Sequence, residues 1–378
     1  MLSPAMIPFI GFFTSLLWMP KKYENHNCIF WGILGLLCLP NAHSLTEMLW
    51  GTYTPFITLL TSLYIVANHL KLKIEANDTS LTLTLFLLFG GLLANILGTT
   101  GASVLLIYPL INLIKYRKQK AHIILFFIFI VCNCGGCLTP LGDPPLLVGY
   151  LKGVKFFWPL QNLWKAYAFM MVALLGLFFC IDAFVSSSRG AQRRGDPVAI
   201  KLTGLPYLGA LALTVGLSFT EFHLAQLALC AFLIYLSKKD LNWHPIEEVA
   251  KIFLVIFIVL IPFEQSFKIT TQPTLFQTFW MCGLLSSILD NTPTYLLFFN
   301  LFSGNPTTLM TTLSPFLKAI SMSAVCMGAL TYIGNAPNLM IRAIATDLGI
   351  EMPSFLGYTR YAFLVLGPVF LVLSIWFL

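Results

Sequence analysis

Long apolar runs follow one another along the whole chain, and they limit the possible folds more than any other feature. Of the 378 residues, 58% are hydrophobic and only 10% are charged. The core of a soluble domain of this size cannot bury so much apolar surface. Runs of about 20 apolar residues instead suit helices that cross a bilayer. The sequence therefore predicts an all-α polytopic membrane protein.

The basic residues lie in short loops between the apolar runs. The net charge is +7, and Lys and Arg gather at 21–22, 71–73, 115–120 and 189–201. Loops of this kind face the cytoplasm and set the orientation of the chain, so we expect no nucleic-acid partner. All four loops share one side only if residues 79–115 enter and leave the membrane on that side. This requirement predicts a re-entrant hairpin.

Four apolar segments are interrupted by polar residues, glycine or proline. They lie at roughly 79–115, 119–151, 273–304 and 313–346. The tip of the first would be "ANILGTTGAS", residues 94–103. Such a tip carries unpaired backbone groups, so it must be buried in protein or line a watery cavity.

Two of these segments match each other at an offset of 192 residues. "GGCLTPLGDPP" (135–145) aligns with "MGALTYIGNAP" (327–337), and five positions are identical. The hairpins have similar spacing, since Asn95 lies 44 residues before Thr139 and Asn291 lies 40 before Thr331. We therefore expect an internal repeat in which Asn95 corresponds to Asn291.

The repeat predicts how the chain is divided. Residues 1–184 form the first repeat, 185–202 a cytoplasmic basic linker, and 203–378 the second repeat. Each repeat has three spans, a re-entrant hairpin, a broken helix and a closing span, which gives about five transmembrane helices, one of them broken. An odd number of crossings inverts the second repeat, and inverted repeats with broken helices are typical of secondary transporters.

Three cysteines, Cys132, Cys134 and Cys137, lie beside the first break and allow a different interpretation. A zinc site needs four ligands, and the nearest histidine, His122, is about ten residues upstream. Free cysteine in apolar segments packs as a small hydrophobe, and we favour that role. A membrane thiol oxidoreductase that uses Cys134 and Cys137 stays as a distant alternative.

Glycine and proline interrupt both broken helices, because proline removes a helix donor and glycine allows open backbone conformations. The residues expected to break the helices are Gly136, Pro140, Gly142, Pro144, Pro145, Gly334 and Pro337. The breaks would free backbone groups to face a small ion, together with the Thr139 hydroxyl and the Asp143 carboxylate.

Asp143 and Asp290 are the acids most relevant to function, because a carboxylate within a membrane segment is costly and marks a functional site. The structural alternatives are a salt bridge or a position at the water boundary for Asp143, and an N-cap role for Asp290. Neutral oxygens near the tips and breaks would complete the site, and they belong to Asn95, Thr99, Thr100, Thr139, Asn291, Thr292, Thr331, Asn335 and Asn338.

These motifs, "ANILGTTGAS", "GGCLTPLGDPP", "DNTPTYL" and "TYIGNAPN", resemble those of NhaD-type bacterial sodium:proton antiporters. That family belongs to an ion-transporter superfamily that also holds citrate, dicarboxylate and arsenite carriers. The resemblance covers nearly the whole chain. It implies two inverted repeats, a mobile transport domain beside a scaffold, and a homodimer. It also implies an ion site lined by Asn95, Thr99, Thr139, Asp143, Asp290, Asn291, Thr331 and Asn335.

The leading hypothesis is therefore exchange of Na⁺ or Li⁺ for H⁺ by alternating access. A poorly hydrated site favours the neutral form of a carboxyl, so protons and Na⁺ would compete for the oxygens of Asp143 and Asp290. The alternative is a Na⁺- or H⁺-coupled citrate or dicarboxylate carrier, although two acids would repel its substrate. We expect no enzyme activity, no cofactor, lipid and small inorganic cations as partners, and the bacterial cytoplasmic membrane as the location.

Overall fold

A computed structural model describes residues 7–18, 24–39, 42–69, 71–75, 78–187, 199–218, 222–237, 241, 243–266 and 273–377. The chain forms two compact units. Unit 1 comprises Met1–Ile65, Leu213–Thr271 and Ser354–Leu356, and unit 2 comprises Val66–Ala212, Gln272–Pro353 and Gly357–Leu378. The expected basic loop at 21–22 and most of the expected linker lie outside the described residues.

Unit 1 contains the helices before the first hairpin and their counterparts in the second half of the chain. They are α1 (Ile7–Trp18), α2 (Glu24–Leu37), α3 (Ala42–Met48), most of α4 (Thr54–His69), the end of α9 (Leu205–Ser218), α10 (His223–Leu236) and α11 (His244–Ser266). A π-helical turn, Leu49–Tyr53, joins α3 to α4. Tyr53 donates to the Ala250 carbonyl at 3.1 Å, and the rings of Phe56 and Phe253 pack 4.6 Å apart.

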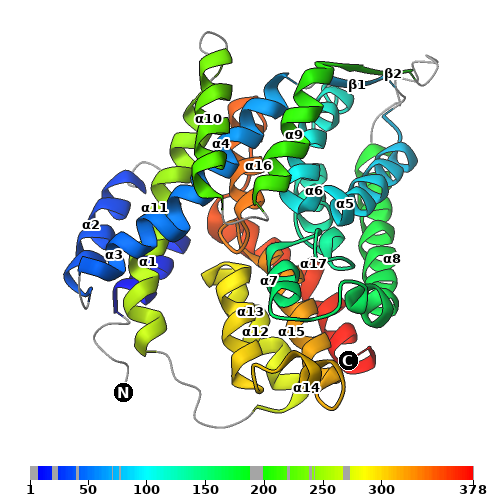
Figure 1. The fold of residues 1–378 in the computed structure, drawn as a ribbon. Coiled ribbons are helices and arrows are strands. Elements are labelled where there is room, and N and C mark those ends of the chain that lie inside the picture. The colour runs from blue at the N-terminus through cyan, green and yellow to red at the C-terminus, as the bar shows by residue number, and fades with distance from the viewer. Residues whose placement is uncertain are drawn as a thin grey trace. The chain divides into compact units, whose positions relative to one another are not determined.

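Unit 2 contains the four interrupted segments and the two closing helices. They are α5 (Ser80–Leu113), α6 (Ala121–Ile130), α7 (Pro144–Leu151), α8 (Trp158–Ser187), α12 (Leu275–Leu289), α13 (Asn291–Leu301), α14 (Pro306–Met310), α15 (Ser314–Cys326), α16 (Ala336–Asp347) and α17 (Phe355–Trp376). Residues 123–137 and 319–330 are buried throughout. The two broken helices are therefore the core of this unit (Figure 1).

Among the described helices, four are long and apolar enough to cross a membrane: 44–66, 80–113, 158–186 and 355–376. Several shorter apolar helices accompany them. The expected all-α polytopic membrane fold with repeats is confirmed. One element was not expected, a two-stranded antiparallel ribbon of β1 (Lys71–Glu75) and β2 (Ala199–Thr203). It pairs Lys73 with Lys201, so two of the basic loops meet at one end of unit 2.

The segment 80–113 is a re-entrant hairpin and not one straight crossing. Its helix is interrupted at Gly98, where φ is 79° and ψ is 154°. The two arms approach so closely that a Cβ on Gly90 would lie 3.0 Å from the Leu106 side chain. The hairpin predicted from the basic loops is confirmed.

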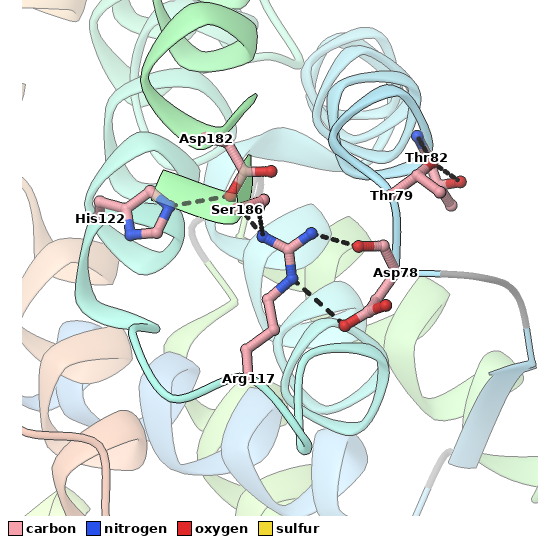
Figure 2. Close-up of polar contacts among 7 residues, drawn as sticks. All are labelled: Asp78, Thr79, Thr82, Arg117, His122, Asp182 and Ser186. Atoms are coloured by element: carbon pink, nitrogen blue, oxygen red, sulfur yellow. Dashed lines mark hydrogen bonds and ion pairs between the residues drawn. The ribbon is translucent and has the colours of Figure 1, made fainter. Parts of the chain in front are cut away.

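A cluster of charged side chains holds the base of this hairpin (Figure 2). Arg117, just after α5, pairs with Asp78, just before it, at 3.3 Å, and with Asp182 of α8 at 2.5 Å. His122 of α6 also contacts Asp182, at 2.9 Å. Both ends of α5 therefore lie at the end of α8 that Asp182 occupies, which is also where the basic loop 115–120 lies.

The second hairpin, α12–α13, enters unit 2 from the opposite end. Its continuation α14 contacts the segment just before α8, where the Lys155 amide donates to Met310 Sδ at 3.3 Å. Since α8 has 30 residues and rises about 1.5 Å per residue, the two hairpin bases are about 40 Å apart. Figure 1 shows α14 and the β1–β2 ribbon at opposite ends of the unit. The two hairpins are therefore inverted relative to each other.

Candidate functional site

The tip of the first hairpin lies against the break of the first broken helix. After α6 the chain forms a 3₁₀ turn, Cys134–Gly136, and resumes as a helix at Pro144. Asn95 Oδ1 accepts from the Leu138 amide at 2.8 Å, and Thr139 Oγ1 donates to the Asn95 carbonyl at 2.5 Å. The free backbone groups of tip and break thus satisfy each other, as a polar site within a bilayer requires.

Asp143 lies where both hairpin tips meet. The residue is 2% exposed. Thr99 Oγ1 of the first hairpin donates to Asp143 Oδ1 at 2.5 Å, and Asn291 Nδ2 of the second donates to Asp143 Oδ2. One carboxylate therefore accepts a hydrogen bond from each hairpin, so Asp143 is buried between the tips and is not a boundary residue.

Asp290 forms the tip of the second hairpin, between α12 and α13. It has φ 73° and ψ 149°, almost the conformation of Gly98. Asp290 Oδ1 accepts from the amide of Asn291 at 2.9 Å, so the side chain does cap the start of α13. The next residue, Asn291, donates to the Asp143 carboxyl. Asp290 therefore caps α13 and also lies next to a residue that contacts Asp143.

The second break repeats the contacts of the first. Thr331 Oγ1 donates to the Ser287 carbonyl at 2.5 Å, which matches the bond from Thr139 to Asn95. Both pairs are 44 residues apart, so Asn95 corresponds to Ser287. The expected equivalence of Asn95 with Asn291 is wrong. The offset of 192 continues through the tips and makes Asn291 the counterpart of Thr99.

Asp143 and Asn335 occupy equivalent positions, 192 residues apart, at the starts of α7 and α16. Both are N-cap residues, yet neither side chain bonds to its own helix. Asp and Asn at this position usually accept a bond from the first turn. The Asp143 side chain instead bonds to both hairpin tips, and the Asn335 side chain is turned toward the first repeat. Asn335 Nδ2 donates to the Cys132 carbonyl at 2.9 Å and to Asn133 Oδ1 at 3.3 Å.

Two expected site residues lie at the edge of this cluster. Thr292 Oγ1 donates to Oδ1 of its neighbour Asn291 at 3.4 Å. The Thr100 carbonyl accepts from the Ser103 hydroxyl at 2.9 Å within the second arm. Thr100 and Thr292 follow Thr99 and Asn291 directly, so they lie near the two carboxyls without bonding to them.

The expected helix-breaking residues lie at the two interruptions. Pro144 and Pro145 begin α7, and Pro337 lies in the first turn of α16. Gly136 and Gly142 pack backbone to backbone, since a Cβ on Gly142 would lie 2.1 Å from the Gly136 carbonyl oxygen. Gly334 and Gly328 do the same in the second break, and Pro140 lies inside the first loop.

Cys137 at the first break faces the other repeat. Cys137 Sγ lies 3.2 Å from Cys326 Sγ, and Cys134, Cys137 and Cys326 are buried. Within the described ranges, no group of three or more His, Cys, Asp or Glu residues could hold a metal ion. The close thiol contact of Cys137 is thus with Cys326, and not with Cys134 as a Cys-x-x-Cys redox pair would require.

Two residues that the sequence patterns did not indicate also lie at the site. Asn133 links the first break to the second, and Ser287 supplies the carbonyl that binds Thr331. Extending the offset of 192 from the breaks to the tips would have identified Ser287 as the counterpart of Asn95. No sequence signal marks Asn133 beyond its place just before the break.

Two opposed hairpins whose tips meet two broken helices, with polar side chains buried at the meeting point, define a class of protein. This is the architecture of a secondary transporter that binds its substrate between repeats near the membrane midplane. The chain is a multi-pass membrane protein of that class.

Comparison with known families agrees with this class. The family described as "Putative citrate transport" matches residues 1–227 and 222–378. The chain belongs to this family, which places it in the citrate-transporter-like superfamily and makes it a secondary transporter. No curated protein matches the chain.

Proposed function

We propose that this protein exchanges Na⁺ or Li⁺ for H⁺ across the bacterial cytoplasmic membrane. The observation that supports this function is the buried Asp143 carboxylate, which receives neutral donors from both hairpin tips. The second acid, Asp290, directly precedes Asn291, one of these donors. The site residues named above, all within the described part of the chain, carry two carboxyl groups and several amide and hydroxyl groups. None of these residues has a cationic side chain. Two acids in a poorly hydrated site attract a cation or a proton.

Coupling follows from competition at the same oxygens. Carboxylate, amide and hydroxyl oxygens are suitable ligands for a hard cation. When a proton occupies Asp143 the carboxyl loses its charge, so it binds Na⁺ weakly. When Na⁺ is bound, protonation costs more. Each time the site crosses the membrane it therefore carries either Na⁺ or H⁺, but not both. The exchange needs no cofactor and no covalent step.

A second candidate is a Na⁺- or H⁺-coupled citrate carrier, which the family description favours. The helices α7, α13 and α16 all begin at the site. Helix N-termini attract carboxylates, and co-bound Na⁺ would offset the charge of Asp143 and Asp290. Under either function we expect contacts with lipid and small cations, a homodimer, and neither an enzymatic reaction nor a nucleic-acid partner.

Transport by purified protein in liposomes separates the two candidates. The vesicles hold a pH-sensitive dye and an acid interior, and Na⁺, Li⁺, K⁺ or labelled citrate is added outside. We expect Na⁺ or Li⁺ to make the interior alkaline, and we expect Asp143→Asn and Asp290→Asn to abolish this response. Glu351→Gln, which changes an exposed acid after α16, is the matched control and should exchange normally. Citrate entry without Na⁺-driven proton movement would establish the second candidate instead.

A further inference from the structure

Three buried asparagines form a continuous chain of hydrogen bonds between the two breaks. Asn338 Nδ2 donates to the carbonyls of Gly328 and Thr331, both at 3.0 Å. Its Oδ1 accepts from Asn133 Nδ2 at 2.7 Å. Asn133 Oδ1 in turn accepts from Asn335 Nδ2 at 3.3 Å. All three residues are at most 4% exposed.

The orientation of each amide in this chain is unambiguous. A backbone carbonyl can only accept, so the side-chain atom that faces it must be the nitrogen. Asn133 Nδ2 faces the Ile128 carbonyl at 2.8 Å, and Asn335 Nδ2 faces the Cys132 carbonyl at 2.9 Å. Because both nitrogens are assigned in this way, Asn133 must present its oxygen to Asn335.

The same geometry explains why the equivalent positions 143 and 335 carry different residues. Asp143 is faced by two donors, Thr99 Oγ1 and Asn291 Nδ2, so an acceptor-only carboxylate fits there. Asn335 is faced by two acceptors, the Cys132 carbonyl and Asn133 Oδ1. A carboxylate at position 335 would face both of these acceptors, and it has no proton to donate to either of them. Such unsatisfied acceptors are costly in a buried site.

We infer that Asn133 and Asn338 are positioning residues that fix Asn335 so that its Oδ1 serves as a cation ligand beside Asp143. The hydrogen bonds that the described residues make with Asn335 use its Nδ2, which donates to the Cys132 carbonyl and to Asn133 Oδ1. The Asp143 carboxyl lies within reach of the same Nδ2. With the nitrogen held on two acceptors, the oxygen is turned away from them. This inference rests on the proposed cation exchange.

The other repeat supplies well-matched substitutions to test this role. Positions 325, 146 and 329, which are 192 residues from 133, 338 and 137, hold Val, Leu and Ala. Asn133→Val and Asn338→Leu therefore remove the amides but introduce side chains that the fold accepts at equivalent sites. Cys137→Ala makes the same kind of change at a packing position in the same break and is the control.

The experiment measures Na⁺/H⁺ exchange in liposomes over a range of Na⁺ concentrations for the wild type and the three variants. Loss of a group that orients a metal ligand typically weakens affinity about 10–100-fold. We expect the KM for Na⁺ to rise at least about tenfold in Asn133→Val, and by less in Asn338→Leu, with maximal rates within about twofold of the wild type. Cys137→Ala should keep the wild-type KM.

The outcomes separate the inference from the function on which it rests. A wild type that exchanges Na⁺, with variants that keep its KM and lose only maximal rate, would give the asparagines a merely structural role and overturn the inference. A wild type that exchanges no Na⁺ for H⁺ would overturn the proposed function itself. If Asn133→Val does not fold, Asn338→Leu decides the question, because it is one link further from Asn335.

Discussion

At the residue scale, Asp290 occupies a backbone conformation that suits glycine. Its φ of 73° and ψ of 149° match those of Gly98 at the equivalent tip, where the chain does use glycine. Residues other than glycine held in such regions cost about 1–3 kcal/mol each and tend to cluster at functional sites. The carboxyl at this tip is therefore kept despite strain, which fits a role in binding ions.

Replacing Asp290 with glycine should separate stability from function. Asp290→Gly relieves the strain and loses one capping bond, whose replacement by glycine costs only a few tenths of a kcal/mol. We expect a net gain of about 1 kcal/mol in the free energy of unfolding and loss of Na⁺/H⁺ exchange. Thermal unfolding in detergent and the liposome assay measure the two effects.

Gly98→Ala is the matched test in the other repeat. A Cβ at Gly98 would lie 3.3 Å from the Leu141 carbonyl oxygen and would impose the same backbone strain. This variant should be less stable than the wild type. If Asp290→Gly were also less stable, the carboxyl would contribute more to folding than its strain costs.

At the element scale, each broken helix depends on two glycines that let the chain pass over itself. The carbonyl oxygen of Gly136 would lie 2.1 Å from a Cβ on Gly142, and that of Gly328 would lie 2.5 Å from a Cβ on Gly334. Both distances are too short for a methyl group. The loop between the two helical parts of each break can therefore close only when these positions are glycine.

Alanine at these glycines should weaken the fold. Gly142→Ala and Gly334→Ala each force the backbone apart, and overpacking of this kind costs about 1–3 kcal/mol. Gly176→Ala in α8 is the control, because a Cβ there meets nothing within 4 Å and alanine favours a helix by about 0.5–1 kcal/mol. Unfolding temperatures of the three proteins in one detergent give the comparison, and equal values would refute the close approach.

At the scale of the whole molecule, the β1–β2 ribbon joins a segment of the first repeat to the end of the expected linker. Lys73 pairs with Lys201, and Lys71 pairs with Thr203. The basic loops at 71–73 and 189–201 therefore share one side, as the orientation of the spans requires. The ribbon itself could not be predicted, because strands of five residues carry little periodic signal and their pairing partner is more than 120 residues away.

A cross-link between the strands should test this arrangement. Lys73→Cys with Lys201→Cys should form a disulfide when oxidised, in a protein with a protease site inserted between 190 and 196. The background carries Cys180→Ser, because Cys180 is an exposed thiol that could compete. After cleavage, the two fragments should stay together on a gel until a reductant is added. Lys71→Cys with Lys201→Cys is two residues out of register and should cross-link more slowly. Equal rates for the two pairs would contradict the register.

Most of the membrane architecture could be read from the sequence. Apolar runs of spanning length, basic loops and the offset of 192 predicted a multi-pass helical protein, a re-entrant first hairpin and two broken helices. These features follow from local physics, because a backbone in lipid must satisfy its own hydrogen bonds and charged loops must stay in water. The same offset aligns Gly98 with Asp290. The expected pairing of Asn95 with Asn291 is inconsistent with this alignment, so the equivalence was not predicted.

The contacts across the site were decided only by the tertiary structure. Thr99 and Asn291 reach the same carboxylate from two hairpins, and Asn133 meets Asn335 about 200 residues away. No local pattern encodes which polar group a buried side chain will face. The sequence determined that polar groups lie within the membrane, while the packing of the two repeats determined that position 143 faces donors and position 335 faces acceptors. That difference in partners is the physical reason why one position holds a carboxylate and the other an amide.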